Sequence, residues 1–280
     1  MKKLKLFLLT KSIGGYINFL SLVYPKKAQQ LAYRFFSEPR TGKLSSENLP
    51  EVLKKARKRE FRFDKYTFQS YSWQGNENTI LLVHGWESNA ARWEKLLKFL
   101  QKTGCTVVAI DAPAHGMTTE KEFNVPRYAE FIREAVSAFQ PKAIIGHSIG
   151  GAATIYHQYK FQNTSIKKLV ILGAPSDLQT IIDQYITLLS LNKRSVSLLE
   201  NHFIAHFNMS VSEFSATTFA KTLEIDGLIV HDTGDVVVAF SEAEKISRSW
   251  KNAQLIETKG LGHSLHDYAL YQKIVDFLET

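Results

Sequence analysis

Short apolar runs separated by longer helical patterns constrain the fold of this chain more than any other sequence feature. Each run has the length and the β-branched content of a strand that is buried on both faces. We expect such strands at Thr79–Val83, Thr106–Ile110, Lys142–Gly146, Lys168–Leu172, Leu228–His231 and Ala253–Glu257. Helical patterns lie between and after them, at 90–102, 124–139, 148–161 and 265–278. This alternation predicts a parallel sheet that helices cover on both faces.

Two further segments complete the expected architecture. Aromatic residues at Phe61, Phe63 and over 66–73 predict two antiparallel strands that precede the parallel ones. Residues 176–223 contain no convincing strand, so we expect a helical lid inserted after one strand. Its helical patterns lie at 178–189, 196–207 and 211–220. The predicted fold is therefore α/β, with a mostly parallel central sheet of about eight strands flanked by helices. The predicted parts are a basic N-terminal helical arm (1–60), a core (61–175 and 224–280) and the lid (176–223).

The net charge of +8 is distributed unevenly along the 280 residues. Residues 1–65 hold 16 Lys and Arg against five acidic residues, whereas the rest of the chain is slightly acidic. A hydrophobic fraction of 44% is ample for a core and excludes disorder for most of the chain. No helix-turn-helix, RNA-binding or zinc-finger signature accompanies the basic residues, so we do not expect nucleic acid as a partner.

The first 24 residues resemble a secretory signal or a membrane span only at first sight. Lys11 interrupts the apolar run, and no small-residue cleavage site follows it. The longest uncharged stretch, 12–24, has 13 residues, which is too short to cross a bilayer. The spacing of Ile13, Tyr16, Ile17 and Leu20 instead predicts an amphipathic helix. A second helix is expected over 26–36, and a third begins near Ser46 and carries the basic cluster 54–59.

Two interpretations of this arm stay open. Its helices pack on the body and turn their lysines to solvent, or residues 1–60 attach peripherally to an anionic membrane surface. The single Cys105 excludes an internal disulfide and a cysteine-based zinc site, and it fits a reducing compartment. We therefore expect a cytoplasmic protein, with contact at the inner face of the membrane left open. His202 and His206 are four residues apart but lack a third ligand, so no metal site is predicted.

The strongest chemical signal is the sequence GHSIG at 146–150, between a predicted strand and a predicted helix. A sharp strand-to-helix turn strains its central residue and needs small flanking residues. Gly146 and Gly150 supply them, and the turn would present Ser148 at the carboxyl edge of the sheet, near the positive end of the following helix. The pattern predicts a nucleophilic serine.

With this motif the chain resembles the α/β-hydrolase superfamily over roughly residues 66–280, in particular bacterial serine hydrolases of the esterase, lipase and thioesterase kind. The resemblance implies a catalytic triad in the order Ser, acid, His. His263, after the last predicted strand, matches the histidine. Asp235 matches the acid, with Asp232 as the alternative, although Val238 stands where the family usually has proline. His266, placed in the final helix, is expected to be structural.

The resemblance also implies an oxyanion hole. One donor is the backbone N–H of Ile149, directly after the nucleophile, and the other is the N–H of Trp86 in the loop after the first parallel strand. His84 would shape that loop rather than act as a second base. The sequence DAPAHG at 111–116 matches a family turn in which Asp111 ties the backbone by hydrogen bonds.

Together these residues imply a serine hydrolase that cleaves an ester or thioester of a small or apolar acyl group through an acyl-enzyme, without cofactor or metal. Carbon–carbon bond hydrolysis on the same triad is one alternative. A non-catalytic protein that uses the fold for binding is the other. Acyl chain length, leaving group and oligomeric state are not specified by the sequence.

Overall fold

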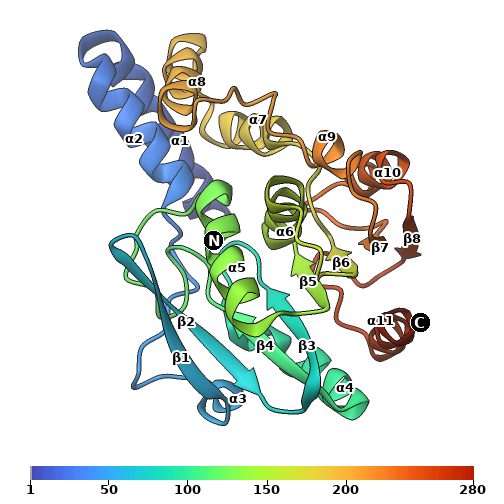
Figure 1. The fold of residues 1–280 in the computed structure, drawn as a ribbon. Helices are drawn as coiled ribbons and strands as arrows, with labels where there is room; N and C mark the ends of the chain where they lie inside the picture. Colours follow the sequence, from blue (N-terminus) through green and yellow to red (C-terminus); the bar gives the residue numbers. More distant parts are fainter. Residues whose placement is uncertain (1) are drawn as a thin grey trace. The chain divides into compact units, whose positions relative to one another are not determined.

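An eight-stranded sheet organises the larger part of the chain (Figure 1). The structure is a computed structural model that describes residues 2–280. The strands are β1 (Arg57–Phe63), β2 (Tyr66–Trp73), β3 (Asn76–Val83), β4 (Cys105–Ile110), β5 (Ala143–His147), β6 (Lys168–Leu172), β7 (Asp226–Asp232) and β8 (Ala253–Thr258), in the order β1-β2-β4-β3-β5-β6-β7-β8. β2 pairs antiparallel with β1 and β4, and the other pairings are parallel. The predicted fold class is confirmed.

Helices cover both faces of this sheet. α5 (Val125–Phe139) and α6 (Ile149–Phe161) pack together on one face, and α4 (Glu94–Leu100) and α11 (Tyr268–Glu279) pack together on the other. Side chains alternate along a strand, so Ile80 and Leu82 of β3 share a core with the α4 and α11 side. The other helices around the sheet are α3 (Glu51–Lys54), α9 (Ala216–Ala220), α10 (Phe240–Ser249) and the 3₁₀ helices η1 (Ala90–Trp93) and η2 (Gln101–Thr103).

The chain divides into two compact units. The sheet and its helices form one unit, residues 39–176 and 216–280. The other, which we call the helical unit, comprises residues 1–38 and 177–215. Its helices are α1 (Lys2–Val23), α2 (Pro25–Ser37), α7 (Leu178–Leu189) and α8 (Lys193–Phe207). These boundaries differ from those expected at 60, 175 and 224, and the division into arm, core and lid stays a prediction.

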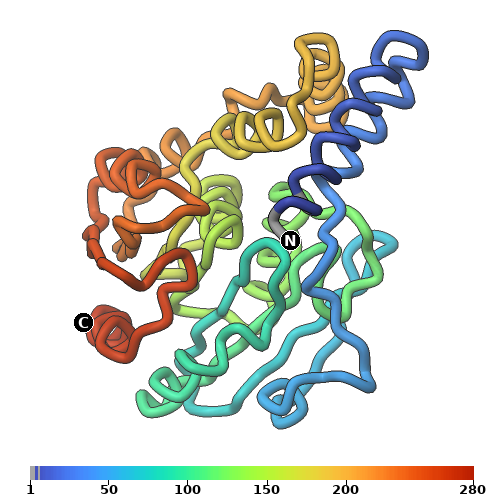
Figure 2. The backbone as a smooth tube through the Cα atoms, turned by 180° about the vertical axis from the view of Figure 1, so that it is seen from behind, coloured from blue at the N-terminus to red at the C-terminus, as the bar shows by residue number. Residues whose placement is uncertain are grey.

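The helical unit has a core of its own, built from segments far apart in the sequence. Ile17 of α1 and Tyr33 of α2 are buried with Ile182 of α7 and Phe203 of α8. Figure 2 shows α1 and α2 side by side as the blue end of the tube. Only Tyr24 separates the two helices in the sequence. The helices expected in the arm therefore pack against the helices expected in the lid.

Three local expectations were wrong. The basic cluster 54–59 does not lie on one helix, because β1 begins at Arg57 and pairs with β2 through Phe63. Pairing with a strand that follows a two-residue turn outweighs the helical propensity of the lysines and arginines. The helix expected over 211–220 is limited to α9. His266 lies before α11 because the Asp267 carboxylate accepts the Leu270 N–H and caps the helix there.

Close packing within the helical unit depends on a glycine. A Cβ at Gly14 would lie 1.6 Å from the backbone oxygen of Leu189, so α1 meets α7 without an intervening side chain. One turn earlier, Lys11 Nζ donates to the carbonyl oxygens of Thr187 and Leu188, each at 3.0 Å. These carbonyls end α7, where the helix dipole favours a cation. At Gly15, by contrast, a Cβ would meet nothing within 4 Å.

Gly14→Ala is expected to destabilise the helical unit by about 1–3 kcal/mol, because α1 must move away from α7. Gly15→Ala is the matched control and should stabilise the unit by about 0.5–1 kcal/mol, since alanine loses less conformational entropy than glycine in a helix. Hydrogen exchange of the α1 and α7 amides in the full chain measures both effects. Equal exchange rates in the two variants would contradict the close approach.

Candidate active site

Ser148 occupies a strained turn between β5 and α6. Its backbone has φ 54° and ψ −130°, a conformation that costs a non-glycine residue free energy. The turn is anchored because the Ser148 N–H donates to the Leu172 carbonyl at the end of β6, at 2.8 Å. The strand–turn–helix arrangement expected around this serine is present.

The two glycines of the turn are required by the space around them. A Cβ at Gly146 would lie 2.7 Å from the Gly151 Cα, and a Cβ at Gly150 would lie 2.3 Å from the His84 carbonyl oxygen. Gly85 is equally confined, with its absent Cβ only 2.8 Å from the Ser148 Cβ. Any side chain at these positions would push the serine out of the turn.

The structure brings the three predicted triad residues into one hydrogen-bonded line. Ser148 Oγ lies 3.0 Å from His263 Nε2, and His263 Nδ1 lies 2.7 Å from Asp235 Oδ2. The Asp235 side chain is buried and that of His263 is largely buried. A carboxylate at Nδ1 fixes the tautomer in which Nε2 accepts the serine proton, so the arrangement is suited to activating Ser148 as a nucleophile.

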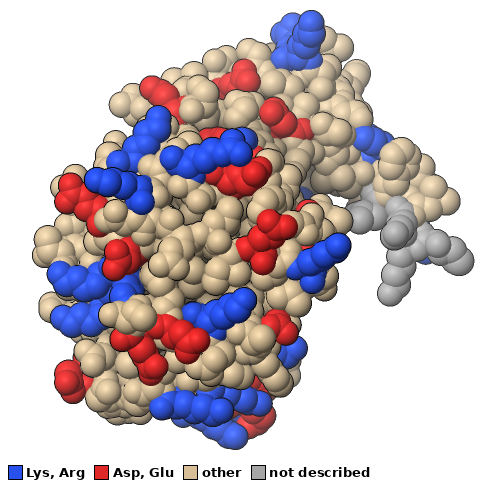
Figure 3. Space-filling view, turned by 90° about the vertical axis from the view of Figure 1, so that its right-hand side faces the viewer, with Lys and Arg blue, Asp and Glu red and all other residues tan. Residues whose placement is uncertain are grey.

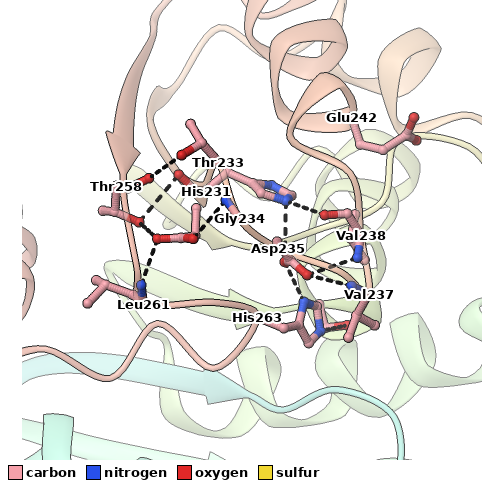
Figure 4. A network of polar contacts seen from close by, with 12 residues as sticks. His231, Thr233, Gly234, Asp235, Val237, Val238, Glu242, Thr258, Leu261 and His263 are labelled. Carbon is pink, nitrogen blue, oxygen red and sulfur yellow. Dashed lines mark hydrogen bonds and ion pairs between the residues drawn. The ribbon is translucent and has the colours of Figure 1, made fainter.

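The Asp235 carboxylate has partners on both oxygens. Oδ1 accepts the N–H groups of Val237 and Val238, at 2.8 and 3.0 Å (Figure 4). Oδ2, which faces His263, also lies 3.4 Å from Nε2 of His231. His231 is buried near the end of β7, and its Nε2–H donates to the Val238 carbonyl at 2.9 Å. The His231 imidazole therefore fixes the loop 235–238, in addition to the contact that His263 makes with Asp235.

Sequence reasoning missed His231 and a further histidine, His147. His147 Nε2–H donates to the His263 carbonyl at 2.8 Å, and the two rings are 4.9 Å apart. Burial lowers the pKa of His147 well below its ordinary value, so the ring is neutral. The available signal was position alone: His147 ends β5 directly before Ser148, and His231 is the last residue but one of β7, four residues before Asp235.

Asp232, the alternative acid, has a different role. Its Oδ2 accepts the Leu261 N–H at 2.8 Å and the Thr258 hydroxyl at 2.9 Å, and Oδ1 accepts the Gly234 N–H at 2.9 Å. The Asp232 carboxylate thus joins the loop after β7 to the loop after β8. Burial by itself would raise its pKa, but these hydrogen bonds outweigh burial and leave the pKa below its ordinary value.

The loop after β3 lies against the nucleophile. His84 Nε2 accepts the Ala112 N–H at 3.0 Å and Nδ1–H donates to the Gly85 carbonyl at 2.8 Å, so His84 shapes this loop as expected. Burial holds the pKa of His84 well below its ordinary value. Trp86 follows Gly85, and its ring packs edge-on against His115 and Phe123.

The expected turn at 111–116 is held by one buried carboxylate. Asp111 Oδ2 accepts the Tyr71 hydroxyl at 3.1 Å and the Met117 N–H at 2.9 Å, and Oδ1 accepts the Ala90 N–H at 3.3 Å. Burial raises the pKa of Asp111 to about 6. At Gly116, with φ 51°, a Cβ would lie 1.9 Å from the Asp111 carboxyl carbon, so only glycine fits there.

Four further residues that the sequence offers as possible ligands or reactive groups are His202, His206, His266 and Cys105. The His202 and His206 rings stack at 5.5 Å in α8, and His202 packs on Tyr33. Among residues 2–280, no group of three His, Cys, Asp or Glu side chains is arranged to hold a metal ion. Cys105 is a free thiol at the start of β4, and His266 Nδ1 bonds the Tyr271 hydroxyl at 2.6 Å.

Comparison with known proteins identifies the family. The profile of the alpha/beta hydrolase fold matches residues 78–258, and the chain belongs to this family. A bifunctional esterase/perhydrolase of Acinetobacter calcoaceticus is 25% identical over 235 residues, which are 66% of this chain and 85% of that protein.

Two solved structures illustrate the range of this fold. A putative lipase from Acinetobacter baumannii aligns with a TM-score of 0.64 at 18% identity, over 84% of this chain and 98% of its own. A meta-cleavage product hydrolase from Pseudomonas fluorescens aligns with a TM-score of 0.58 at 17% identity, over 76% of this chain and 94% of its own. At sequence identities this low, the structural similarity shows that the fold is shared and nothing more.

Asp232→Asn is expected to flatten the dependence of stability on acid pH. Because the folded-state pKa of Asp232 is lowered, its contribution to stability is present above the ordinary Asp pKa, about 3.9, and is lost as pH falls further. The variant should lose about 1–3 kcal/mol at neutral pH, since three donors lose a charged acceptor. Free energies of unfolding of both proteins from neutral to acid pH test this. A difference that did not shrink on acidification would contradict it.

Proposed function

We propose that the protein is a serine hydrolase that cleaves an ester or thioester of a small or apolar acyl group through an acyl-enzyme. The observation that carries this proposal is the line from Ser148 Oγ through His263 to Asp235, with contacts of 3.0 and 2.7 Å. Membership of the alpha/beta hydrolase family and the relative named as an esterase support the reaction class.

The first half-reaction forms the acyl-enzyme. Ser148 Oγ attacks the carbonyl carbon as its proton passes to His263 Nε2, and the Asp235 carboxylate stabilises the resulting imidazolium. The negative charge that develops on the carbonyl oxygen is assigned to the backbone N–H groups of Trp86 and Ile149. Ile149 opens α6, where N–H groups have no partner within the helix. Collapse expels the alcohol or thiol, which takes the proton from His263 Nε2.

The second half-reaction hydrolyses this intermediate. His263 Nε2 accepts a proton from water as the water oxygen attacks the acyl carbon. The second tetrahedral species then collapses, the Ser148–acyl bond breaks, and Ser148 Oγ recovers its proton from His263. The carboxylic acid leaves. Each step uses only this chain's residues and water, so the proposal includes no cofactor.

His147 and His231 are assigned as positioning residues. His147 holds the backbone carbonyl of His263, and His231 holds the carbonyl of Val238 and faces the Asp235 carboxylate. Neither imidazole is assigned a part in moving the Ser148 proton. Their proposed effect is to limit the movement of the His263 and Asp235 loops, which keeps the proton path aligned through both half-reactions.

A fluorophosphonate probe is expected to label the wild-type protein on Ser148, because only an activated serine attacks such a phosphorus centre readily. Ser148→Ala should not be labelled. Ser264→Ala removes an exposed hydroxyl beside His263 and serves as the matched control, with labelling retained. Mass spectrometry of the labelled peptide locates the adduct. Labelling of Ser148→Ala at the wild-type level would contradict the assignment.

Asp235→Asn is expected to lower kcat by about 10⁴-fold, because asparagine does not hold His263 with a proton on Nδ1. Asp232→Asn also neutralises a buried carboxylate near the end of β7, and it should change kcat by less than about tenfold. Hydrolysis of p-nitrophenyl esters and acyl thioesters of graded chain length measures both variants. Equal losses would contradict Asp235 as the acid. Absence of turnover by the wild type on the whole series would favour a carbon–carbon substrate or a binding protein.

A further inference from the structure

α1 presents apolar side chains on the side that faces away from its helical partners. Its buried side consists of Thr10, Gly14, Ile17, Leu20 and Ser21, and it faces α2 and α7. At about 3.6 residues per turn, the opposite side of the helix carries Leu4, Leu8, Tyr16, Phe19, Leu22 and Val23. We call these six residues the apolar face of α1. Their side chains are between 48% and 63% exposed.

Such a face is unusual for a helix whose other side is already packed. Surface helices normally turn charged and polar residues outward, and a row of large exposed apolar side chains marks an interaction site. Tyr24 continues the row just beyond the helix, at 65% exposure. The apolar face of α1 is therefore expected to be covered by a partner that has an apolar surface of its own.

The charges around this face indicate which partner. Residues 1–37 contain seven Lys and Arg and no acidic residue. Lys5 on α1 and Lys26 and Lys27 at the start of α2 are exposed. The other segment of the helical unit, 177–215, has four acidic residues against two basic ones, so the positive charge is concentrated on α1 and α2. Elsewhere, the face seen in Figure 3 has Lys/Arg and Asp/Glu side chains interspersed.

We propose that the apolar face of α1 docks on an anionic lipid bilayer. The apolar side chains enter the boundary between headgroups and acyl chains, while Lys5, Lys26 and Lys27 contact the headgroup phosphates. No helix among residues 2–280 is both long and apolar enough to cross a membrane, so α1 lies in the plane of the interface. Two copies meeting through this face would bring their lysines together, and like charges disfavour that contact. The inference rests on α1 and α2 and is independent of the proposed hydrolase activity.

Co-sedimentation of the full chain with vesicles tests this docking. Vesicles of phosphatidylcholine with an equal part of phosphatidylglycerol are expected to bind the wild type at least about tenfold more strongly than phosphatidylcholine alone, and added salt should weaken the binding. Ser148→Ala should bind equally well, which separates docking from catalysis. No binding to the anionic vesicles would overturn the proposal.

Matched variants distinguish the face from the rest of the surface. Tyr16→Ser with Phe19→Ser should lower the partition coefficient by about tenfold or more, because the inserted apolar area is lost. Tyr268→Ser removes from α11 a ring that is more exposed than that of Tyr16 or Phe19, and it should leave binding unchanged. These positions are exposed, so circular dichroism should show folded proteins. Equal binding by the Tyr16/Phe19 variant and the Tyr268 variant would overturn the assignment.

Charge is tested in the same way. Lys26→Glu with Lys27→Glu should reduce binding by more than about tenfold, because each lysine lost near an anionic surface costs about fivefold. Lys251→Glu with Lys273→Glu makes the same change in net charge at exposed positions of the other unit and should bind like the wild type. Light scattering, which measures the oligomeric state, tests whether the face binds a second copy of the chain instead. A wild-type dimer that Tyr16→Ser with Phe19→Ser dissociates would assign the face to a second copy and overturn lipid docking.

Discussion

The strained backbone at Ser148 is the constraint on which the rest of the site depends. A serine with φ 54° between β5 and α6 persists only where its neighbours leave no alternative, and three glycines bring the backbone of β3 and the start of α6 into contact around it. Because β3, β5, β6, β7 and β8 are parallel neighbours, their carboxyl ends meet at one edge of the sheet. Short loops after β7 and β8 are then sufficient to reach the serine.

The sequence was sufficient for features encoded in contiguous residues. The glycines at 146 and 150 and the serine between them form a local pattern. Asp235 and His263 were assigned from the resemblance to the α/β-hydrolase superfamily, and the structure brings the three side chains together. The contributions of His147 and His231 depend instead on which carbonyl each imidazole meets in space. That is decided by strand register and loop conformation, which no local spacing encodes.

The same distinction explains the helical unit. Periodicity predicted helices near the N-terminus and after β6, but each pattern indicates only that a helix has a buried side, without naming what buries it. Lys11 and Asn18 meet the end of α7 and the turn that follows it more than 170 residues later in the chain. The basic cluster at 54–59 was misread for a related reason, since the pairing of β1 with β2 overrides local helical propensity.

The shared core of α1, α2, α7 and α8 has a consequence for shortening this protein. Removing the first 24 residues takes away Ile17 and the Lys11 ammonium, leaving Ile182 and Leu189 without their cover and the carbonyls that end α7 without their cation. A shortened chain would then be prone to aggregation for reasons unrelated to any partner. The N-terminal helix is a structural member of its unit, and single substitutions on its outer side are the cleaner means of probing it.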